Sequence, residues 1–431
     1  MGQTAIRITT AATSSEGSNE NPTQGPSLRR VLWNRPFFLL WLGQLVSNSG
    51  DYIFDVAIVW LVLKATGSPF YVGLVLAASL LPGVLVGPIA GVYVDRLNRR
   101  SLMLAANAFQ AAISLGIALL YVAGLLPMVA LLGLVFALNA GAQFIRPTVT
   151  AVIPVLVERT DLPAANGLLS MSSSLNQFVG YGLGGVAVLL FGPSLAIYYD
   201  AATFVFAFVM VSLIAPVRLA TPGRGATLGE SFLTSFKEGV RYIASSRVLL
   251  EILVLALVVN FFGAGIGALF GPYTSFAIHG DSSTYGLVLA ASALGLLVGS
   301  LTVAKVNMRR HVGKVLFVGI VAIGIVTMVM GAFAFLWVAV AMSALLGFFE
   351  GLVNLPLQVL IQTRVPGNLL GRVATSLGAM VTAATPVSSA ISGGVATYLS
   401  VPEVFVIYGG MIVAATGVSA LLFKDLRKIS Y

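Results

Sequence analysis

Four polar side chains lie along one side of the first long apolar segment, residues 36–63. Gln44, Asn48, Asp51 and Asp55 follow one another at spacings i, i+4, i+7 and i+11, so a helix places them on one narrow face. A carboxylate that faces lipid costs at least ~2.5 kcal/mol, and ionisable groups within a membrane mostly face a bundle interior or water. We therefore predict an aqueous pathway along this face. The alternative is that the four groups only hydrogen-bond to neighbouring helices.

Further polar faces occur in the apolar segments near 127–157, 164–190 and 336–361. The residues are Asn139, Gln143 and Arg146 in the first, Gln177 in the second, and Glu350, Asn354 and Gln358 in the third. We expect these faces to converge with the first one and to line a central cavity. Asp51, Asp55 and Glu350 are the candidate proton carriers, because a carboxylate can exchange protons when its surroundings alternate between wet and dry.

Depth in the bilayer separates the charged groups of these faces. At ~1.5 Å per residue, Asp51 lies roughly 22 Å from the start of its segment and Arg146 roughly 28 Å from the opposite surface, so we do not expect the two to pair. Arg146 either contacts a ligand or reaches the near surface and braces charges there. Asp200, near the start of segment 195–215, is expected to cap or anchor its helix. Aromatic residues that either line the cavity or pack against lipid are Phe261, Phe262, Phe348, Phe349 and Tyr199.

Composition restricts the class of protein. Of 431 residues, 58% are hydrophobic and 9% charged, and the mean hydropathy is +0.97, which excludes an ordinary soluble domain. The chain has no Cys and only His279 and His311, which excludes a disulfide framework and a thiolate metal site. Neither a nucleotide-binding loop nor a Ser-His-Asp arrangement is apparent. We therefore expect no enzyme, no catalytic residue, no metal and no cofactor.

Twelve apolar segments are long enough to cross a bilayer, which takes ~20 helical residues. They fall near 36–63, 69–93, 101–123, 127–157, 164–190, 195–215, 248–272, 284–304, 314–334, 336–361, 372–397 and 402–423. We predict an all-α membrane protein with two six-helix halves, 36–215 and 248–431, the second ending in a short tail. Residues 1–35 read as a disordered tail, and linker 216–247 as containing an amphipathic helix that lies on the membrane or packs on the bundle.

Basic residues are distributed unequally between the two ends of these segments. Of the 24 Lys and Arg residues, 22 fall on the side of the membrane that holds both termini. Lys64 falls on the opposite side, and Arg146 lies inside a span. The positive-inside rule then places both termini in the cytoplasm, with the chain in a plasma or inner membrane. This placement explains the net charge of +9 without nucleic acid as a partner.

The two halves repeat one sequence plan. Residues 73–79 and 286–292 both read GLVLAAS, and each copy is followed by a Gly-x-Leu-Val-Gly run and a basic pair. Pro147 and Pro356, and the glycine pairs 184–185 and 393–394, are each separated by 209 residues. Parallel duplication of a six-span unit is one of the repeat patterns of secondary transporters, whose site lies near the midplane between the halves.

The loop after the second segment reads Gly91-Val-Tyr-Val-Asp95-Arg96-Leu-Asn-Arg99-Arg100. It resembles the major facilitator superfamily signature Gly-x-x-x-Asp-Arg-x-x-Arg-Arg/Lys at all five key positions. An Asp at a helix end beside several Arg can form charge-assisted pairs that break when two halves rock. The resemblance implies that Gly91, Asp95, Arg96, Arg99 and Arg100 form a gating latch. The alternative is that these charges only set the topology.

Four more stretches are similar to the drug/proton antiporter branch that includes macrolide-efflux and siderophore exporters. They are Trp41-Leu-Gly-Gln44, Tyr199-Asp200-Ala-Ala-Thr-Phe204, Glu238-Gly-Val-Arg241 and Gln362-Thr-Arg-Val-Pro366. The antiporter motif of the fifth span, Gly-x-x-x-Gly-Pro-x-x-Gly-Gly, is present only as Gly180-Tyr-Gly-Leu-Gly184-Gly185.

The resemblance implies a carrier that exports amphipathic small molecules, such as a drug, antibiotic or siderophore, by alternating access. It also implies that a proton gradient drives this export. We expect a monomer whose partners are a small-molecule substrate and the lipid bilayer. The alternatives are a lysophospholipid or solute transporter of the same fold, and a receptor that binds without transport.

Overall fold

The computed structural model describes residues 26–215, 230–305 and 312–422, and every regular element within these ranges is a helix. The all-α prediction is thereby confirmed for the described chain. Most of the predicted tail, part of the predicted linker and the second basic pair, at 309–310, lie outside the described residues.

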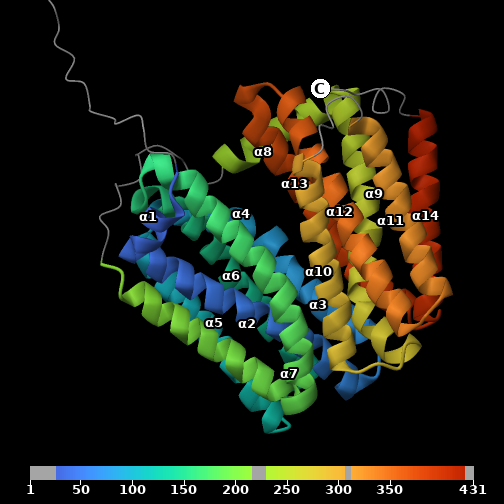
Figure 1. Cartoon of the computed structure of the whole chain (residues 1–431), viewed down its shortest axis with the longest axis horizontal. Helices are drawn as coiled ribbons and strands as arrows, with labels where there is room; N and C mark the ends of the chain where they lie inside the picture. The colour runs from blue at the N-terminus through green and yellow to red at the C-terminus, as the bar shows by residue number, and fades with distance from the viewer. Residues whose placement is uncertain (1–25, 216–229, 306–311, 423–431) are drawn as a thin grey trace, which may run out of the picture.

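The first half consists of α2 to α7 (Figure 1). Their bounds are α2 Arg35–Thr66, α3 Pro69–Leu85, α4 Gly87–Arg96, α5 Arg99–Val122, α6 Met128–Leu156 and α7 Leu162–Ser212. The predicted second span is divided into α3 and α4, which separate at Val86 next to Pro88, a residue without a backbone N–H. The predicted fifth and sixth spans are the two helical segments of α7, which are separated where Gly192, with a φ of 79°, turns the chain.

The second half consists of α9 to α14. Their bounds are α9 Arg247–Pro272, α10 Ser282–Lys305, α11 Val312–Ala332, α12 Leu336–Arg364, α13 Gly367–Val395 and α14 Val401–Leu422, with a π-helical turn, Tyr273–Ala277, after α9. Nine of the described helices are long and apolar enough to span a membrane, and α7 among them crosses twice. Together with the α3–α4 pair and the Ser-rich and Thr-rich α13, they complete the twelve predicted spans.

The halves meet through two helix pairs, α3 with α13 and α7 with α10. In both pairs the backbones approach too closely for a side chain to fit between them. A Cβ on Gly73 would lie 2.9 Å from the Cα of Gly393, and a Cβ on Gly185 would lie 2.9 Å from the Cα of Gly286. Small residues allow such close packing of helices in membranes. The glycine that begins each GLVLAAS copy is therefore a contact point between the halves.

Both glycine contacts lie at the same end of the molecule, which we call the closed end. Gly73 is near the start of α3 and Gly393 near the finish of α13, far from helices α1 (Leu28–Trp33) and α8 (Glu230–Ser245). Figure 1 shows the halves diverging toward the end that carries α1 and α8, which we call the terminal end. The apolar packing agrees, because the larger buried cluster combines residues of both halves, whereas a smaller one contains residues of α1 and the first half alone.

The predicted amphipathic helix is observed as α8, which packs on α13 and α9. Its Ile243 is buried, and a Cβ on Gly239 would lie only 2.5 Å from the carbonyl oxygen of Arg372. Glu238 forms an ion pair with Arg372, and Ser376 Oγ donates to a backbone carbonyl of α8 at 3.1 Å. Of the two alternatives for this helix, packing on the bundle is thus the one observed.

Candidate functional site

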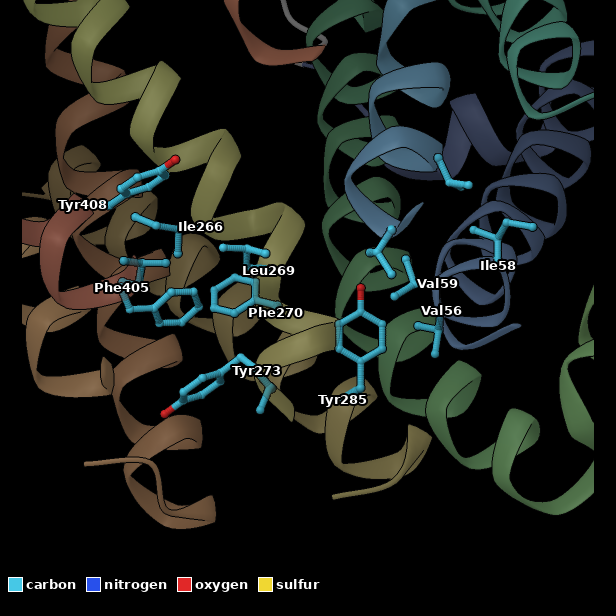
Figure 2. Packing of buried hydrophobic residues seen from close by; sticks show 14 of the residues in the cluster. Val56, Ile58, Val59, Ile266, Leu269, Phe270, Tyr273, Tyr285, Phe405 and Tyr408 are labelled. Atoms are coloured by element: carbon cyan, nitrogen blue, oxygen red, sulfur yellow. The ribbon is translucent and has the colours of Figure 1, made fainter. Parts of the chain in front are cut away.

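The acidic face of α2 points toward the junction between the halves. Asp55 interacts electrostatically with Tyr181 of α7 and with Tyr285 of α10, and α10 belongs to the second half. Figure 2 shows the Tyr285 ring beside Val56 and Val59 of α2. The face is therefore directed into the molecule and not toward lipid.

Asp51 and Asp55 are partly exposed, and neither forms a hydrogen bond or an ion pair with any described side chain. The two acids interact with each other, and the exposed Arg146 of α6 is the cation that acts on Asp51. The depth argument correctly predicts that no direct ion pair forms between Arg146 and Asp51, although their charges interact. Two carboxylates on adjacent helical turns repel when both are ionised, so this face favours the binding of one positive charge.

The other α2 residues predicted for this site differ in accessibility. Gln44 is buried, whereas Asn48 is partly exposed. Near them, the indole Nε1 of Trp41 donates to Ser172 Oγ of α7 at 2.9 Å, which ties the first turns of α2 to the neighbouring helix. The accessible part of the polar face therefore begins at Asn48.

On α6 and α7, the predicted site residues are only partly exposed, apart from Arg146. Asn139 Nδ2 donates to a carbonyl of its own helix at 3.0 Å, and Gln143 Nε2 donates to the carbonyl of Asn139 at 3.2 Å. Gln143 Oε1 would lie 3.6 Å from a Cβ on Gly87, so it faces the break between α3 and α4. Gln177 is partly exposed on α7. The amide oxygens of Asn139 and Gln143 are therefore the groups that can accept a hydrogen bond from a ligand.

The polar face of α12 stands apart from that of α2. Glu350 is partly exposed, and Asn354 and Gln358 are exposed. Among the described charged groups, Glu350 does not act on Asp51 or Asp55, nor do they act on it. The polar faces of α2 and α12 were expected to converge, but they form two separate polar regions in this conformation. The assignment of all of these residues to one cavity stays a prediction.

The predicted aromatic lining is divided between the protein core and the surface. Phe262 lies with its ring centroid 5.1 Å from that of Tyr408, and Phe348 lies 5.4 Å from Phe349. Phe262 and Phe349 pack against the main apolar cluster. Tyr199 is 46% exposed and lies 3.3 Å from Ser49 Oγ. Phe262 and Phe349 are partly exposed, and whether their exposed parts line the cavity or face lipid stays a prediction.

Two arginines of the predicted latch bind backbone carbonyls of other helices within the first half. Arg99 Nη1 donates to the carbonyl of Ala151 in α6 at 2.8 Å. Arg100 donates from Nη2 to the carbonyl of Ser212 at 2.6 Å and from Nε to that of Ile214 at 2.9 Å, at the finish of α7. The last carbonyls of a helix lack partners within the helix and carry its negative dipole end, so those at the finish of α7 favour the guanidinium of Arg100.

The remaining latch residues belong to α4. Gly91 lies in the middle of α4 and Arg96 is exposed at its final residue. Asp95 is also in α4, but its side chain lies outside what the structure describes. A gating role for the five residues stays a prediction.

One ion pair of the terminal end has no signal in the sequence. Arg30 donates from Nε to Asp161 Oδ2 at 2.9 Å and from Nη2 to Oδ1 at 2.8 Å, and the backbone N–H of Ser27 donates to Oδ1 at 2.9 Å. These hydrogen bonds lower the pKa of Asp161. The pair joins residues 131 positions apart, in α1 and in the turn between α6 and α7, and so braces the first half.

A second feature that sequence reasoning only partly predicted is Asp200. It lies inside the second segment of α7 and not at its beginning, so the prediction that it caps this helix is wrong. The prediction that it anchors the helix is confirmed, because its Oδ2 accepts from Ser114 Oγ of α5 at 2.8 Å. Asp200 also interacts electrostatically with Asp51 and Asp55. The sequence signal for this close contact was Gly50, which precedes Asp51. Because it has no side chain, α2 can approach Asp200 and Thr203 of α7.

Comparison with known proteins supports this architecture. The family described as transmembrane secretion effector matches residues 31–430. Macrolide efflux protein A of Streptococcus pyogenes is 23% identical over 92% of this chain and 98% of its own. The multidrug efflux pump Tap of Mycolicibacterium fortuitum is 26% identical over 91% of this chain and 97% of its own.

Solved structures show the same fold. The nucleoside transporter NupG superposes with a TM-score of 0.70 at 14% identity and covers 90% of this chain and 98% of its own. A bacterial homolog of the human lysosomal transporter Spinster, in an inward-facing conformation, superposes with a TM-score of 0.67 at 14% identity. The match covers 91% of this chain and 96% of the homolog. With its twelve spans, its duplicated halves and the family match along nearly its whole length, this chain belongs to the transmembrane secretion effector family of major facilitator transporters.

Proposed function

We propose that this transporter exports amphipathic small molecules, of drug, antibiotic or siderophore type, in exchange for protons by alternating access. The observation that carries the proposal is the position of Asp51 and Asp55. They are two carboxylates without described partners on adjacent turns, and they face a junction between halves that is tight at one end only. Such a group can bind a proton or a cationic ligand from one side and release it after the halves rock.

The direction of transport follows from charge and from the relatives. If the positive-inside rule holds here, the terminal end and both termini are cytoplasmic, and the chain lies in a plasma or inner membrane. The divergence of the halves at the terminal end then gives cargo access from the cytoplasm. Two relatives are named for efflux, of macrolides in one case and of multiple drugs in the other, which favours export over uptake.

Competition between cargo and protons couples the two movements in this scheme. A cationic cargo bound near Asp51 requires that carboxylate to be ionised, and cargo release at the far side leaves it free to take up a proton. Arg146 repels cations on one side of Asp51, which limits the face to one bound positive charge. The amide oxygens of Asn139 and Gln143 add acceptors without adding charge.

A growth assay identifies the cargo. Cells with and without this protein are exposed to a panel of macrolides, cationic dyes and siderophores, each with and without a protonophore. Export predicts growth protection by the protein against at least one compound, and loss of that protection with the protonophore. Protection that survives the protonophore would contradict proton coupling. If the protein moves only lysophospholipid, the proposed cargo class of drugs, antibiotics and siderophores is wrong.

Proteoliposomes then test the site with that compound and an imposed pH gradient. Asp51→Asn and Asp55→Asn should each abolish proton-driven transport while the purified protein stays folded. Glu158→Gln, which removes an exposed acid at the finish of α6, is the matched control and should transport like the wild type. Unchanged transport in both Asp variants would remove the proposed coupling site.

A further inference from the structure

Asp200 is the most buried acid among the described side chains of the first half, and it has too few partners for an ionised carboxylate. Its side chain is 0% exposed, in the second segment of α7. Oδ2 lies 2.8 Å from Ser114 Oγ, and Oδ1 is buried with no hydrogen-bond partner among the described residues. A buried charge without compensating hydrogen bonds or an opposite charge costs several kcal/mol, on the order of the penalty for one desolvated ion.

The charged groups around Asp200 do not offer that compensation. α2 presents Asp51 and Asp55, and α5 presents the neutral hydroxyl of Ser114. The cation of this region, Arg146 of α6, acts on Asp51 but is not among the described groups that act on Asp200. An ionised Asp200 would therefore face two further acids with one hydroxyl as its only described donor.

The hydrogen bonds of Ser114 fit the protonated form of Asp200. Ser114 Oγ lies 2.8 Å from Asp200 Oδ2 and 3.2 Å from the carbonyl oxygen of Ile197, but the hydroxyl has a single proton. With an ionised Asp200, that proton goes to Oδ2 and the contact with Ile197 has none. With a protonated Asp200, Oδ2–H donates to Ser114 Oγ and the Ser114 hydroxyl donates to Ile197, so both contacts are hydrogen bonds. Oδ1 is then a neutral carbonyl oxygen, which is much less costly to leave unpaired.

Asp200 also lies against the helix that carries the proposed coupling acids. A Cβ on Gly50 would lie 2.9 Å from Asp200 Oδ1 and 2.2 Å from Thr203 Oγ1, so only glycine allows α2 to approach this side of α7. Oδ1 thus faces the backbone of α2 next to Asp51. Because like charges in a medium of low dielectric constant repel strongly, the protonation of one acid in this group alters the proton affinity of the others.

We propose that Asp200 is a third proton-binding carboxyl of the transporter, protonated in this conformation, whose proton is coupled to the charge on Asp51 and Asp55. The coupling part of this inference rests on the proposed function. When a proton binds to Asp51 or Asp55, it removes a negative charge that keeps the proton on Asp200. Asp200 can then ionise by passing its proton to the α2 carboxylate that is still charged. The charge on the α2 face then changes by two while the three carboxyls together gain one proton.

Infrared spectroscopy of the purified transporter tests the protonation state. The wild type should show the C=O stretching band of a protonated, buried carboxylic acid, with a shift in D2O. Asp200→Asn should lose this band, since the amide has the same shape and can still donate to Ser114. Ser114→Ala should shift the band, and Glu158→Gln should leave it in place. A band of unchanged position and intensity in a folded Asp200→Asn variant would overturn the assignment, and so would a band unmoved by Ser114→Ala if Asp200→Asn does not fold.

Transport tests the coupling separately. In proteoliposomes, Asp200→Asn should keep substrate binding but lose the pH dependence of transport that the wild type shows. An unchanged pH profile in Asp200→Asn would overturn the coupling and leave only a structural role. Wild-type transport that no proton gradient drives would instead defeat the proposed function, while the infrared band would still decide whether Asp200 holds a proton.

Discussion

In the first half of the transporter, α2 carries Asp51 and Asp55 in the middle of its length, whereas α9, which opens the second half, carries Glu251 in its first two turns and Asn260 in its middle. Glu251 is paired with Arg247 one turn away, and Asn260 donates to a carbonyl of its own helix. The acids of α2 have no such described partners. The helix that begins each half therefore has free carboxylates in one half only.

The packing of the halves, in contrast, is nearly the same in both. Gly73 of the first half meets Gly393 of the second, and Gly185 of the first meets Gly286 of the second. In each pair, a Cβ on the first glycine would lie 2.9 Å from the Cα of the other. A duplicated chain that retains its glycine contacts but differs in its acids indicates two separate constraints. The contact between the halves needs the glycines of both halves, whereas the proposed proton chemistry needs the acids of the first half only.

The largest effect is expected from breaking the shared packing. Gly286→Val should prevent contact at the closed end, because a Cβ there would lie 2.5 Å from the carbonyl oxygen of Tyr181 and 2.7 Å from the Cα of Gly185. Overpacking typically costs about 1–3 kcal/mol and occasionally more, and each 1.4 kcal/mol shifts the conformational equilibrium about 10-fold. Since the chain has no Cys, a single Ala290→Cys substitution reports opening of the closed end by labelling with an impermeant thiol reagent.

The matching substitution in the other pair, Gly73→Val, should act in the same way, with more labelling and loss of transport. Gly133→Val is the control, because a Cβ on this α6 glycine meets nothing within 4 Å. Equal labelling in the Gly286→Val variant and the control would show that the glycine contacts do not hold the closed end.

The next effect concerns the acids and separates the two halves. Asp51→Asn should lower proton-driven transport by about 100-fold or more, the range expected when a group that transfers protons is lost. Glu350→Gln should lower it by less than about 10-fold, because Glu350 does not act on the α2 acids in this conformation. Both variants are measured in two ways: by transport rate at a fixed pH gradient and by exchange of labelled cargo without a gradient.

Exchange of a neutral cargo without a gradient should survive in Asp51→Asn, because it requires rocking but neither a proton nor the cation-binding carboxylate. If Glu350→Gln is the more damaging of the two, the proposed chemistry belongs to the second half or to both. That result would reverse the contrast between the halves without altering the fold.

Three features of the sequence were enough to predict most of the fold. The length of the apolar segments predicted the twelve spans, and the repeated motifs predicted the duplication. Helical periodicity predicted the acidic face of α2, from the i, i+4, i+7, i+11 positions of Gln44 to Asp55. The boundary between the predicted spans 164–190 and 195–215 coincides with the kink of α7 at Gly192. The depth of Asp200 was missed, because it depends on which helices pack together. Polar faces predict which side of a helix avoids lipid, but not whether two faces meet, as α2 and α12 demonstrate.

The terminal end offers a finer comparison, since each half has its own brace there. In the first half, Arg30 and Ser27 hold Asp161, whose side chain is 6% exposed. In the second half, Glu238 of α8 pairs with Arg372, and both side chains are nearly half exposed. Exposed ion pairs contribute little because water screens them. We therefore expect the first brace to matter more for stability.

Removal of this brace should produce an effect that depends on pH. Because the pKa of Asp161 is lowered from 3.8 in the folded protein, its contribution is present above about pH 4 and is lost as the pH falls further. Asp161→Asn should thus lower Tm at pH 7 by on the order of 3 °C, and the difference from wild type should vanish toward acid. Thermal unfolding in detergent measures this Tm difference. Glu238→Gln, which removes the exposed ion pair of the second half, should lower Tm by less. A Tm difference that is constant with pH would exclude the carboxylate charge as its cause.

The smallest expected effect tests the packing of α8 on the second half. Gly239→Ala introduces a Cβ that would lie 2.5 Å from the backbone carbonyl oxygen of Arg372, so α8 must move away from α13. Replacing glycine by alanine inside a helix also stabilises the helix by about 1 kcal/mol, which offsets part of a packing cost of about 1–3 kcal/mol. The net loss of stability should therefore be about 0–2 kcal/mol. Gly167→Ala in α7 is the matched control, because nothing lies within 4 Å of its Cβ and only the stabilising contribution remains. If both variants unfold at the same temperature above that of the wild type, α8 is not held tightly against α13, and the second half lacks the brace that the first half has.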